Sequence, residues 1–576
     1  MRIASRLLPL LLLAACSTTT IAERPSAAPS SIGAAVSAAD PRAAEAGREI
    51  LAKGGSAVDA AAAVMLALTV VEPQSSGIGG GSFIVVHDAK TGLATYDGRE
   101  EAPSSATPKW FLDAAGKAPA SFDAARAGGR SVGVPGNIAN IALAHKQHGK
   151  LPWAAIFQPA IKLARDGFAI TPRFHGVLES YRSFLSSSPE AQLLYYQADG
   201  TPKPLGATVY NPALASFLSD VAEHGPEHFY RGKAAERLVA AVRSSPRSQS
   251  TMTVADVAAY ESRPRAPVCG QYRTYKVCGM GPPSSGGPAV YAILKQLERF
   301  DLPAMKRSDA TTWHLISESM RLAYADRAQW IADPDHTPVP TAGLMSDSYM
   351  TERSSLIAAD KRMATAPAGN PPGAMNIASA PDTEVAGTSS LSVADAAGNV
   401  VAMTSTIEAP FGSGVLVDGY VLNNELTDFN LVPDVDGVPT ANRVQPGKRP
   451  RSSMAPMIAY DAAGKPVLSI GAAGGATIIA QVAKAMIGVL DWKMSVQDAI
   501  AMPQVVAMGD LVRLEKGTDL EALAPALTAM GHKVQITGLP LKANGVELAP
   551  QGWRGGADPR SEGESLAFGQ ALLEPK

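Results

Sequence analysis

The stretch Gly387-Thr388-Ser389-Ser390-Leu391-Ser392-Val393 marks an abrupt change in the character of the chain. Residues 360–387 are rich in Ala, Pro and Gly and show no hydrophobic period, as is typical of an exposed linker. Beyond it, Leu391 and Val393 alternate with small residues, and the pattern returns over residues 399–406. A period of two predicts strands. The linker therefore ends where a sheet begins.

Helical patterns dominate the chain before this boundary. Asp40-Pro41 predicts a helix start, with Asp as N-cap and Pro at the first position, and Gly54-Gly55 predicts its end. A second helix, over residues 56–71, is apolar nearly all round and is expected to be buried. Further helices are expected at 137–147, 151–166, 234–243 and 311–332, and further strands at 83–86, 415–422 and 467–470.

The composition excludes several function classes. With 576 residues, 46% hydrophobic, the chain can form three or four domains or one large multilayer enzyme. Its 51 basic and 53 acidic residues give a net charge of −2, so no nucleic-acid partner is expected. Three cysteines are too few for a disulfide scaffold, and the 9 histidines lack H-E-x-x-H spacing. We therefore expect no metal and no cofactor.

The N-terminus has the pattern of an export signal. Residues 1–15 place two arginines before an apolar run that is too short to span a bilayer, which predicts a lipoprotein-type signal peptide. Leu13-Ala14-Ala15-Cys16 resembles the bacterial lipobox, in which the cysteine is lipidated; ordinary cleavage with Cys16 incidental is the alternative. Residues 16–34 are then a flexible tether. We expect an exported, periplasmic protein that contacts the membrane only through a lipid on Cys16.

Cys269 and Cys278 lie in a strand-turn-strand pattern. Outside the cytoplasm they could form a hairpin disulfide, and two isolated buried thiols are an equal alternative.

Three other motifs suggest chemistry that their context disfavours. The glycines of residues 77–81 open a strand rather than a helix, which favours close backbone packing over phosphate binding. Gly129-Arg130-Ser131-Val132-Gly133 matches a G-x-S-x-G nucleophile elbow, but no strand leads into it. His145 and His148 could be a metal pair, but no acidic or cysteine partner lies in the segment, so we expect solvent-exposed surface.

The region around residue 387 resembles the processing site and light-subunit start of the γ-glutamyltranspeptidases. Matching motifs follow in one order over residues 35–570. After the linker they are Gly387-Thr388, Ser392-Val393-x-Asp395, Gly398-Asn399, Thr404-Ser405-Thr406, Phe411-Gly412-Ser413-Gly414, Leu422-Asn423-Asn424-Glu425-x-x-Asp428-Phe429, Pro446-Gly447-Lys448-Arg449-Pro450-x-Ser452-Ser453-Met454, Gly471-x-x-Gly474-Gly475 and Asp558-Pro559-Arg560. Before it they are Gly54-Gly55-Ser56-Ala57-Val58-Asp59-Ala60, Gly79-Gly80-Gly81, Arg99-Glu100-x-Ala102-Pro103, Gly133-Val134-Pro135-Gly136 and Pro283-Ser284-Ser285-Gly286-Gly287.

The resemblance implies an α+β fold of the N-terminal-nucleophile hydrolase type, a four-layer αββα sandwich with two mainly antiparallel sheets. It implies self-cleavage between Gly387 and Thr388 into a heavy part, residues 35–387, and a light part, residues 388–576, which stay together as a heterodimer. Cleavage matters chemically because it gives Thr388 a free α-amine, which titrates near pH 8 and can act as the base for its own hydroxyl.

The implied activity is that of a γ-glutamyltransferase or glutathione hydrolase. Glutathione and other γ-glutamyl compounds would form an ester on Thr388, which water, an amino acid or a dipeptide resolves. The resemblance assigns oxyanion binding to the amides of Gly474 and Gly475, support of the nucleophile to Thr406, and grip on the substrate carboxylate and ammonium to six side chains. These are Arg99, Ser452 and Ser453 for the carboxylate, and Glu408, Glu425 and Asp428 for the ammonium.

Taken singly, these residues have other interpretations, such as a surface ion pair between Arg99 and Glu100 or a solvated loop at residues 425–428. The chain also departs from the family pattern. Ser390 stands where the family commonly has a histidine, and residues 430–445 contain no aromatic residue, whereas some bacterial members cover the site with a tyrosine. We therefore expect a more open site.

Two alternatives to this function stay open. One is a related acylase that acts on glutaryl or similar side chains of β-lactams, against which the three acidic residues argue. The other is a surface lipoprotein that keeps the fold but is neither processed nor active.

Overall fold

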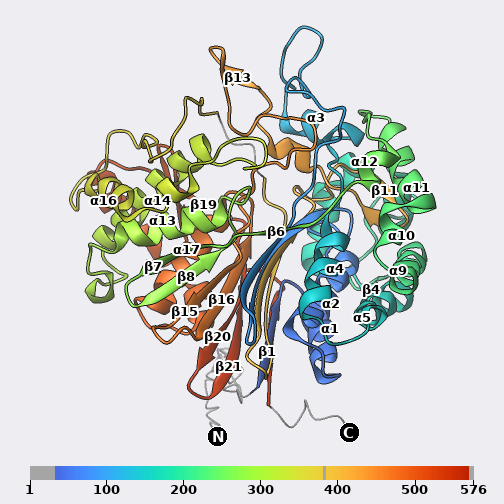
Figure 1. The fold of residues 1–576 in the computed structure, drawn as a ribbon, viewed down its shortest axis with the longest axis horizontal. Coiled ribbons are helices and arrows are strands. Elements are labelled where there is room, and N and C mark those ends of the chain that lie inside the picture. The colour runs from blue at the N-terminus through green and yellow to red at the C-terminus, as the bar shows by residue number, and fades with distance from the viewer. Residues whose placement is uncertain (1–32, 381–384, 570–576) are drawn as a thin grey trace, which may run out of the picture.

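Two antiparallel β-sheets lie face to face at the centre of the computed structural model, which describes residues 33–380 and 385–569 (Figure 1). The first sheet has seven strands in the order β22-β1-β9-β10-β2-β3-β6. Their bounds are Ala34–Ala38 (β1), Gly81–Asp88 (β2), Gly92–Gly98 (β3), Arg263–Arg265 (β6), Ser389–Ala394 (β9), Val400–Thr406 (β10) and Glu564–Phe568 (β22). The predicted linker thus leads directly into a central strand, β9.

The second sheet has six strands in the order β21-β20-β16-β15-β8-β7. They are Val268–Tyr272 (β7), Tyr275–Gly279 (β8), Met457–Tyr460 (β15), Pro466–Ala473 (β16), Lys542–Ala549 (β20) and Gly552–Ala557 (β21). All the pairings in both sheets are antiparallel. Both sheets combine strands from before and after residue 387, so the two parts form one core.

Helices cover the outer face of each sheet. On the first sheet pack α1 (Pro41–Ala52), α2 (Ala57–Val71) and α4 (Asn137–His148), with α5 (Trp153–Asp166) packed on α2; on the second pack α13 (Gly286–Leu297) and α17 (Thr477–Leu490), with α14 (Ala310–Trp330) packed on α13. Figure 1 shows α1, α2, α4 and α5 on one side of the sheets and α13, α14 and α17 on the other. The predicted four-layer αββα sandwich is confirmed.

The alternation in β9 explains why this strand joins two layers. Leu391 and Val393 pack into the core beneath α1 and α2. Ser392 points the other way, where its hydroxyl lies 3.1 Å from that of Ser469 in β16. Small residues let the sheets approach closely, since a Cβ on Gly471 would lie 2.3 Å from Ser390 Oγ. The serines that interrupt the apolar pattern therefore serve sheet packing.

The predicted helix starts and ends are close to those observed. Asp40 caps α1 and its side chain accepts a hydrogen bond from Arg42 N, while every residue of α2 is buried. One boundary needs correction, because Ala34, placed at the end of the tether, is the first residue of β1 and is 0% exposed. Its pairing partner is Phe568 in β22. A short run of Ala and Ser lacks the bulky β-branched pattern that announces a strand.

The remaining elements lie around this sandwich. The helices are Phe122–Arg126 (α3), Pro172–Ser180 (α6), Arg182–Leu185 (α7), Pro189–Tyr195 (α8), Pro212–His224 (α9), Glu227–Tyr230 (α10), Gly232–Arg243 (α11), Val254–Ala258 (α12), Thr341–Leu344 (α15), Asp347–Ser355 (α16), Val496–Ala501 (α18) and Ala524–Ala529 (α19). The strands are Phe168–Ala169 (β4), Thr208–Val209 (β5), Leu416–Val417 (β11), Tyr420–Val421 (β12), Asp434–Val435 (β13), Val438–Pro439 (β14), Val505–Met508 (β17), Leu511–Glu515 (β18) and Lys533–Thr537 (β19). Across 33–380 and 385–569, no helix has the length and apolarity needed to cross a bilayer.

Candidate active site

Thr388 lies immediately before β9, with its side chain 4% exposed. Its hydroxyl donates a hydrogen bond of 3.0 Å to the hydroxyl of Thr406, the last residue of β10. Thr406 Oγ1 in turn accepts a 2.8 Å bond from the amide of Glu408. The neighbouring strands β9 and β10 thus fix the hydroxyl of Thr388, as predicted for a supported nucleophile.

The backbone at the predicted cleavage site is strained. Thr388 has a φ of +77°, a region that β-branched residues rarely adopt, at a typical cost of about 1–3 kcal/mol. A Cβ on Gly387 would lie 1.6 Å from the carbonyl oxygen of Glu408, so only glycine fits there. Cleavage of the Gly387–Thr388 bond would release this strain.

Arg99 follows β3 and is fully buried. Its guanidinium forms ion pairs with Glu425 and Asp428, which both lie on one 3₁₀ turn, Glu425–Asp428. It also donates a 2.8 Å bond to the carbonyl of Arg451 and a 3.2 Å bond to that of Pro450. The predicted carboxylate-binding and ammonium-binding groups therefore pair with one another.

Burial shapes the protonation of the acidic residues here. Desolvation raises the pKa of Glu408 and of Glu425 well above the ordinary carboxyl value, and Arg99 opposes this shift at Glu425. Glu100, buried 3.8 Å from Arg99, has its pKa raised to about 7 for the same reason. Glu408 accepts hydrogen bonds from Val385 N at 3.1 Å and from Asn424 Nδ2. A cation bound here would favour the ionised form of these acids.

The two serines of the Ser452-Ser453 motif are held by residues that precede the linker. The carbonyl of Ser452 accepts bonds of 2.7 and 2.6 Å from the amide and hydroxyl of Ser285, in the turn that opens α13. Ser453 Oγ accepts a 2.7 Å bond from Arg327 of α14. Arg327 belongs to none of the motifs identified in the sequence, because it lies inside the long helix α14, 126 residues before Ser453.

Gly474 and Gly475 connect β16 to α17, with φ values of +132° and +58°. A Cβ on Gly474 would lie 2.4 Å from Pro540 O, and one on Gly475 2.5 Å from Val385 O. Neither amide donates a hydrogen bond to another residue that the structure describes. Two free amides next to a helix N-terminus are suited to an oxyanion.

These groups surround one cavity of about 230 Å³. Its lining includes nine of the ten predicted site residues; the tenth, Gly474, is not part of the lining. The lining residues are Arg99, Val385, Thr388, Thr406, Glu408, Glu425, Asp428, Ser452, Ser453, Met454, Gly475 and Ile478. A threonine hydroxyl, a glycine backbone and side chains of opposite charge thus face one small space, an arrangement suited to acyl transfer from a zwitterionic donor.

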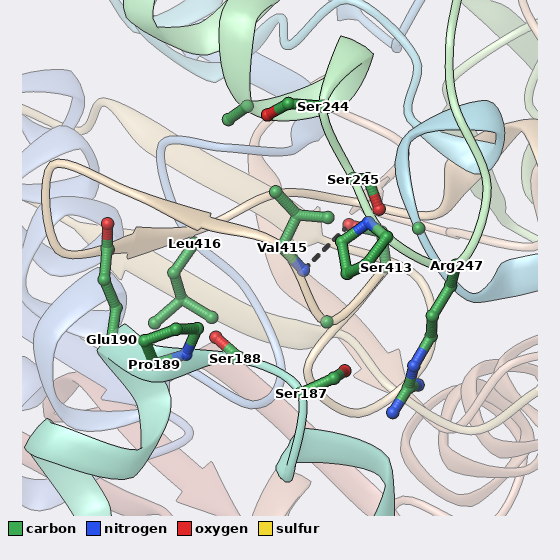
Figure 2. A pocket seen from close by; sticks show the side chains of 14 residues that line it. Ser187, Ser188, Pro189, Glu190, Ser244, Ser245, Arg247, Ser413, Val415 and Leu416 are labelled. Atoms are coloured by element: carbon green, nitrogen blue, oxygen red, sulfur yellow. Dashed lines mark hydrogen bonds between the residues drawn. The ribbon is translucent and has the colours of Figure 1, made fainter.

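A larger cavity, of about 720 Å³, shares no lining residue with the first (Figure 2). Most of the labelled polar groups are serines, and the chain itself uses several of their hydroxyls. Ser413 Oγ donates to Leu422 O and accepts from Val415 N, and Ser244 Oγ donates to Ala240 O. We assign this cavity no part in the reaction.

The motifs that the sequence disfavoured have structural roles. Ser131 is buried on a 3₁₀ turn and its hydroxyl donates to the carbonyls of Arg126 and Gly128. The glycines before β2 pack closely, since a Cβ on Gly80 would lie 1.9 Å from Thr406 O. Cys269 and Cys278 form the disulfide that the sequence left open.

The prediction for the two histidines was wrong about exposure. The side chain of His148 is 6% exposed and bonds to Asp88 at 2.8 Å and to Tyr96 OH at 2.6 Å, while that of His145 is 16% exposed and lies 3.5 Å from Asp59. Their acidic partners come from other elements, which the local segment could not reveal. Over the described residues, no cluster of three or more His, Cys, Asp or Glu could hold a metal ion.

Comparison with known proteins agrees with this geometry. The chain is 38% identical to the glutathione hydrolase proenzyme of Bacillus subtilis (strain 168), covering 86% of this chain and 84% of that protein. It is 34% identical to the glutathione hydrolase proenzyme of Escherichia coli (strain K12), covering 91% and 90%. The structure of a cephalosporin acylase from Bacillus halodurans superimposes with a TM-score of 0.82 at 28% identity, covering 93% and 96%. The family model for gamma-glutamyltranspeptidase matches residues 43–568, and the chain belongs to that family.

Proposed function

We propose that this chain is a self-processing γ-glutamyltransferase and glutathione hydrolase. One observation carries the proposal: Thr388 lies at a strained linker-to-strand junction, with its hydroxyl in the same cavity as the Arg99, Glu425 and Asp428 ion cluster. The γ-glutamyl group carries an α-carboxylate and an α-ammonium, which complement these opposite charges. On binding, the substrate carboxylate takes the place of the protein carboxylates at Arg99, and its ammonium takes the place of the guanidinium.

The reaction starts with cleavage of the Gly387–Thr388 bond, which frees the α-amine of Thr388. This amine takes the hydroxyl proton as the oxygen attacks the γ-amide carbon of the donor. The amides of Gly474 and Gly475 bind the oxyanion, and Thr406 orients the hydroxyl. The amine passes the proton to the leaving nitrogen, and water or an acceptor amine then resolves the ester.

A related acylase activity is the second candidate, because the chain resembles the cephalosporin acylase structure over 93% of its length. A glutaryl group differs from a γ-glutamyl group in lacking the ammonium. The acidic residues Glu408, Glu425 and Asp428 of the buried site would then have no ligand ammonium to bind, which favours the γ-glutamyl donor.

Two chromogenic substrates separate the two candidates. We expect the purified, cleaved protein to turn over γ-glutamyl-p-nitroanilide at least about 100-fold more efficiently than glutaryl-p-nitroanilide, given the cost of an unmatched buried polar group. Faster release from the glutaryl compound would overturn the γ-glutamyl assignment. No release from either would support the inactive lipoprotein.

We also propose that the protein is exported and anchored in the periplasm through a lipid on Cys16. The support is the signal-like pattern of residues 1–15 and the lipobox-like Leu13-Ala14-Ala15-Cys16; these residues lie outside the described part of the chain. Cell fractionation of a bacterial host tests the proposal. Wild-type protein should sediment with membranes and Cys16→Ser should not, whereas equal distribution of the two would contradict lipid anchoring.

A further inference from the structure

A buried ion pair lies directly behind Thr388, outside the donor cavity. Glu72, the C-cap residue that follows α2, and Lys542, the first residue of β20, are joined by a 2.8 Å contact, and each side chain is 4% exposed. Ser389, the residue after the nucleophile, donates its hydroxyl to the same Glu72 oxygen at 2.5 Å and lies 3.4 Å from Lys542 Nζ. The pair thus contacts β9, the strand that begins one residue after Thr388.

The pair also holds the turn that contacts the nitrogen of Thr388. The carbonyl of Glu72 accepts the amide of Ser75 at 2.9 Å, and Lys542 Nζ lies 3.4 Å from Ser75 Oγ. The carbonyl of Ser75 accepts the amides of Thr388 at 3.1 Å and of Ile407 at 3.3 Å. When the chain is cut, the nitrogen of Thr388 becomes the α-amine, and the Ser75 carbonyl can accept one of its N–H bonds.

The two charges act on this amine in opposite directions. A cation nearby disfavours the protonated amine and an anion favours it, and both effects are strong where water is excluded. Glu408 lines the same cavity as Thr388. Arg173 and Asp40 are the other charges that act on Lys542, whose pKa burial lowers. Glu72 and Lys542 both contact Ser389, the residue next to Thr388.

We propose that Glu72 and Lys542 are positioning residues that hold the Ser75 carbonyl against the α-amine of Thr388 and together set the proton affinity of that amine. The inference rests on the proposed function, because it needs Thr388 as an N-terminal nucleophile. The amine works as a base only when neutral, so the acidic limb of the kcat–pH profile reports its protonation.

The test uses cleaved enzyme with γ-glutamyl-p-nitroanilide as the substrate. Lys542→Met removes the cation and should move the acidic limb of kcat to higher pH, whereas Glu72→Gln removes the anion and should move it to lower pH, each by about one unit. Lys542→Arg and Glu72→Asp keep the charges and should restore the wild-type limb. Shifts in the same direction, or none, would overturn the proposal.

A matched control and a double variant complete the design. Lys484 is another buried lysine, on α17, whose Nζ bonds to the carbonyls of Ile500 and Met502, so Lys484→Met should leave the limb in place. If a single variant does not fold, the charge-neutral Glu72→Gln/Lys542→Met pair is measured instead. It should lower kcat about tenfold with little change in KM, because the Ser75 turn is no longer fixed; an unchanged kcat would refute the inference.

The wild-type protein separates this inference from the proposed function. Mass spectrometry must first show a fragment that starts at Thr388, together with γ-glutamyl turnover. If the wild type fails these two measurements, the proposed function fails. If it passes them and the pH limbs do not move apart, only the role of Glu72 and Lys542 fails.

Discussion

The two halves of the cavity differ in how much of their chemistry exists before cleavage. On the recognition side, Arg99 is already paired with Glu425 and Asp428, all three buried and in place. On the nucleophile side, Thr388 Oγ1 bonds to the hydroxyl of Thr406 and, among the described residues, to no histidine or carboxylate. The recognition side is complete in the intact chain, whereas the nucleophile lacks a base until the chain is cut.

This difference explains how Thr388 can be unreactive towards substrates in the intact chain and reactive in the cleaved protein. The uncleaved chain gives the Thr388 hydroxyl no α-amine as a base, which disfavours turnover, while the strain at its φ of +77° favours the single attack on its own preceding carbonyl that cuts the chain. The buried ion cluster, by contrast, is stable only as a set, since removing one partner leaves an unpaired charge. Substitutions on the two sides should therefore have different consequences for cleavage and for turnover.

The largest effect is expected on the nucleophile side. Thr388→Ala should abolish both self-cleavage and turnover, lowering kcat by about four orders of magnitude or more, because the attacking oxygen is absent. Thr388→Ser keeps the oxygen and should retain cleavage. A denaturing gel shows the two fragments, and mass spectrometry identifies their ends. A cleaved Thr388→Ala chain, or a fragment that starts at Ser389 or Ser390, would assign the attack to another residue.

A change on the recognition side should separate binding from processing. Arg99→Lys keeps the charge but loses the planar guanidinium. Transition-state binding should therefore weaken by about 2–5 kcal/mol, which lowers kcat/KM on a γ-glutamyl anilide roughly 30-fold or more. Self-cleavage should persist. Arg263→Lys is a matched control, because Arg263 is 41% exposed in a pair with Asp335 and exposed pairs contribute little. Unchanged kinetics in Arg99→Lys would remove Arg99 from the donor site.

A smaller effect is expected from the acid behind Arg99. The pKa of Glu100 is raised to about 7, so the folded protein holds a proton that the unfolded chain has lost at the ordinary carboxyl value. The stability that this proton provides is present at low pH and is lost as the pH rises towards 7. The thermal midpoint of the wild type should therefore decrease as the pH rises from 5 to 7.5.

Glu100→Gln removes this titration and should reduce the fall by about 2 °C. Glu227→Gln, at a side chain that is 69% exposed, should leave it unchanged. Parallel curves for the wild type and Glu100→Gln would show that Glu100 does not titrate in this range.

The sequence could predict the elements and the site residues that belong to local patterns. Alternation marked β9 and β10, and motif order identified Arg99 and Gly475, which the fold brings into one cavity. Residues that act through distant partners carried no such signal. Arg327 on α14 holds Ser453, and Lys542 on β20 pairs with Glu72, from opposite ends of the chain.

The prediction that His148 is solvent-exposed was wrong for the same reason. His148 looked exposed because its partner Asp88 lies in β2, outside its own segment. Packing between distant segments is decided by the whole fold, and a local pattern reports only which residues are able to pack. The sequence could not decide whether Cys269 and Cys278 form a disulfide, because a hairpin spacing permits the bond without requiring it.

The smallest expected effect concerns the ratio of hydrolysis to transfer, that is, whether water or an acceptor amine resolves the γ-glutamyl ester. Residues 430–445 contain no aromatic residue; within them β13 (Asp434–Val435) and β14 (Val438–Pro439) form a short hairpin, and Val432 and Val435 are 46% and 41% exposed. A covered site protects the ester from water, and an open one does not. With glutathione as donor and glycylglycine at low millimolar concentration, free glutamate should therefore exceed γ-glutamyl-glycylglycine by a few-fold, at neutral and at mildly alkaline pH. Chromatographic measurement of the two products gives the ratio. If the dipeptide product dominates, some element other than this hairpin shields the ester from water during deacylation.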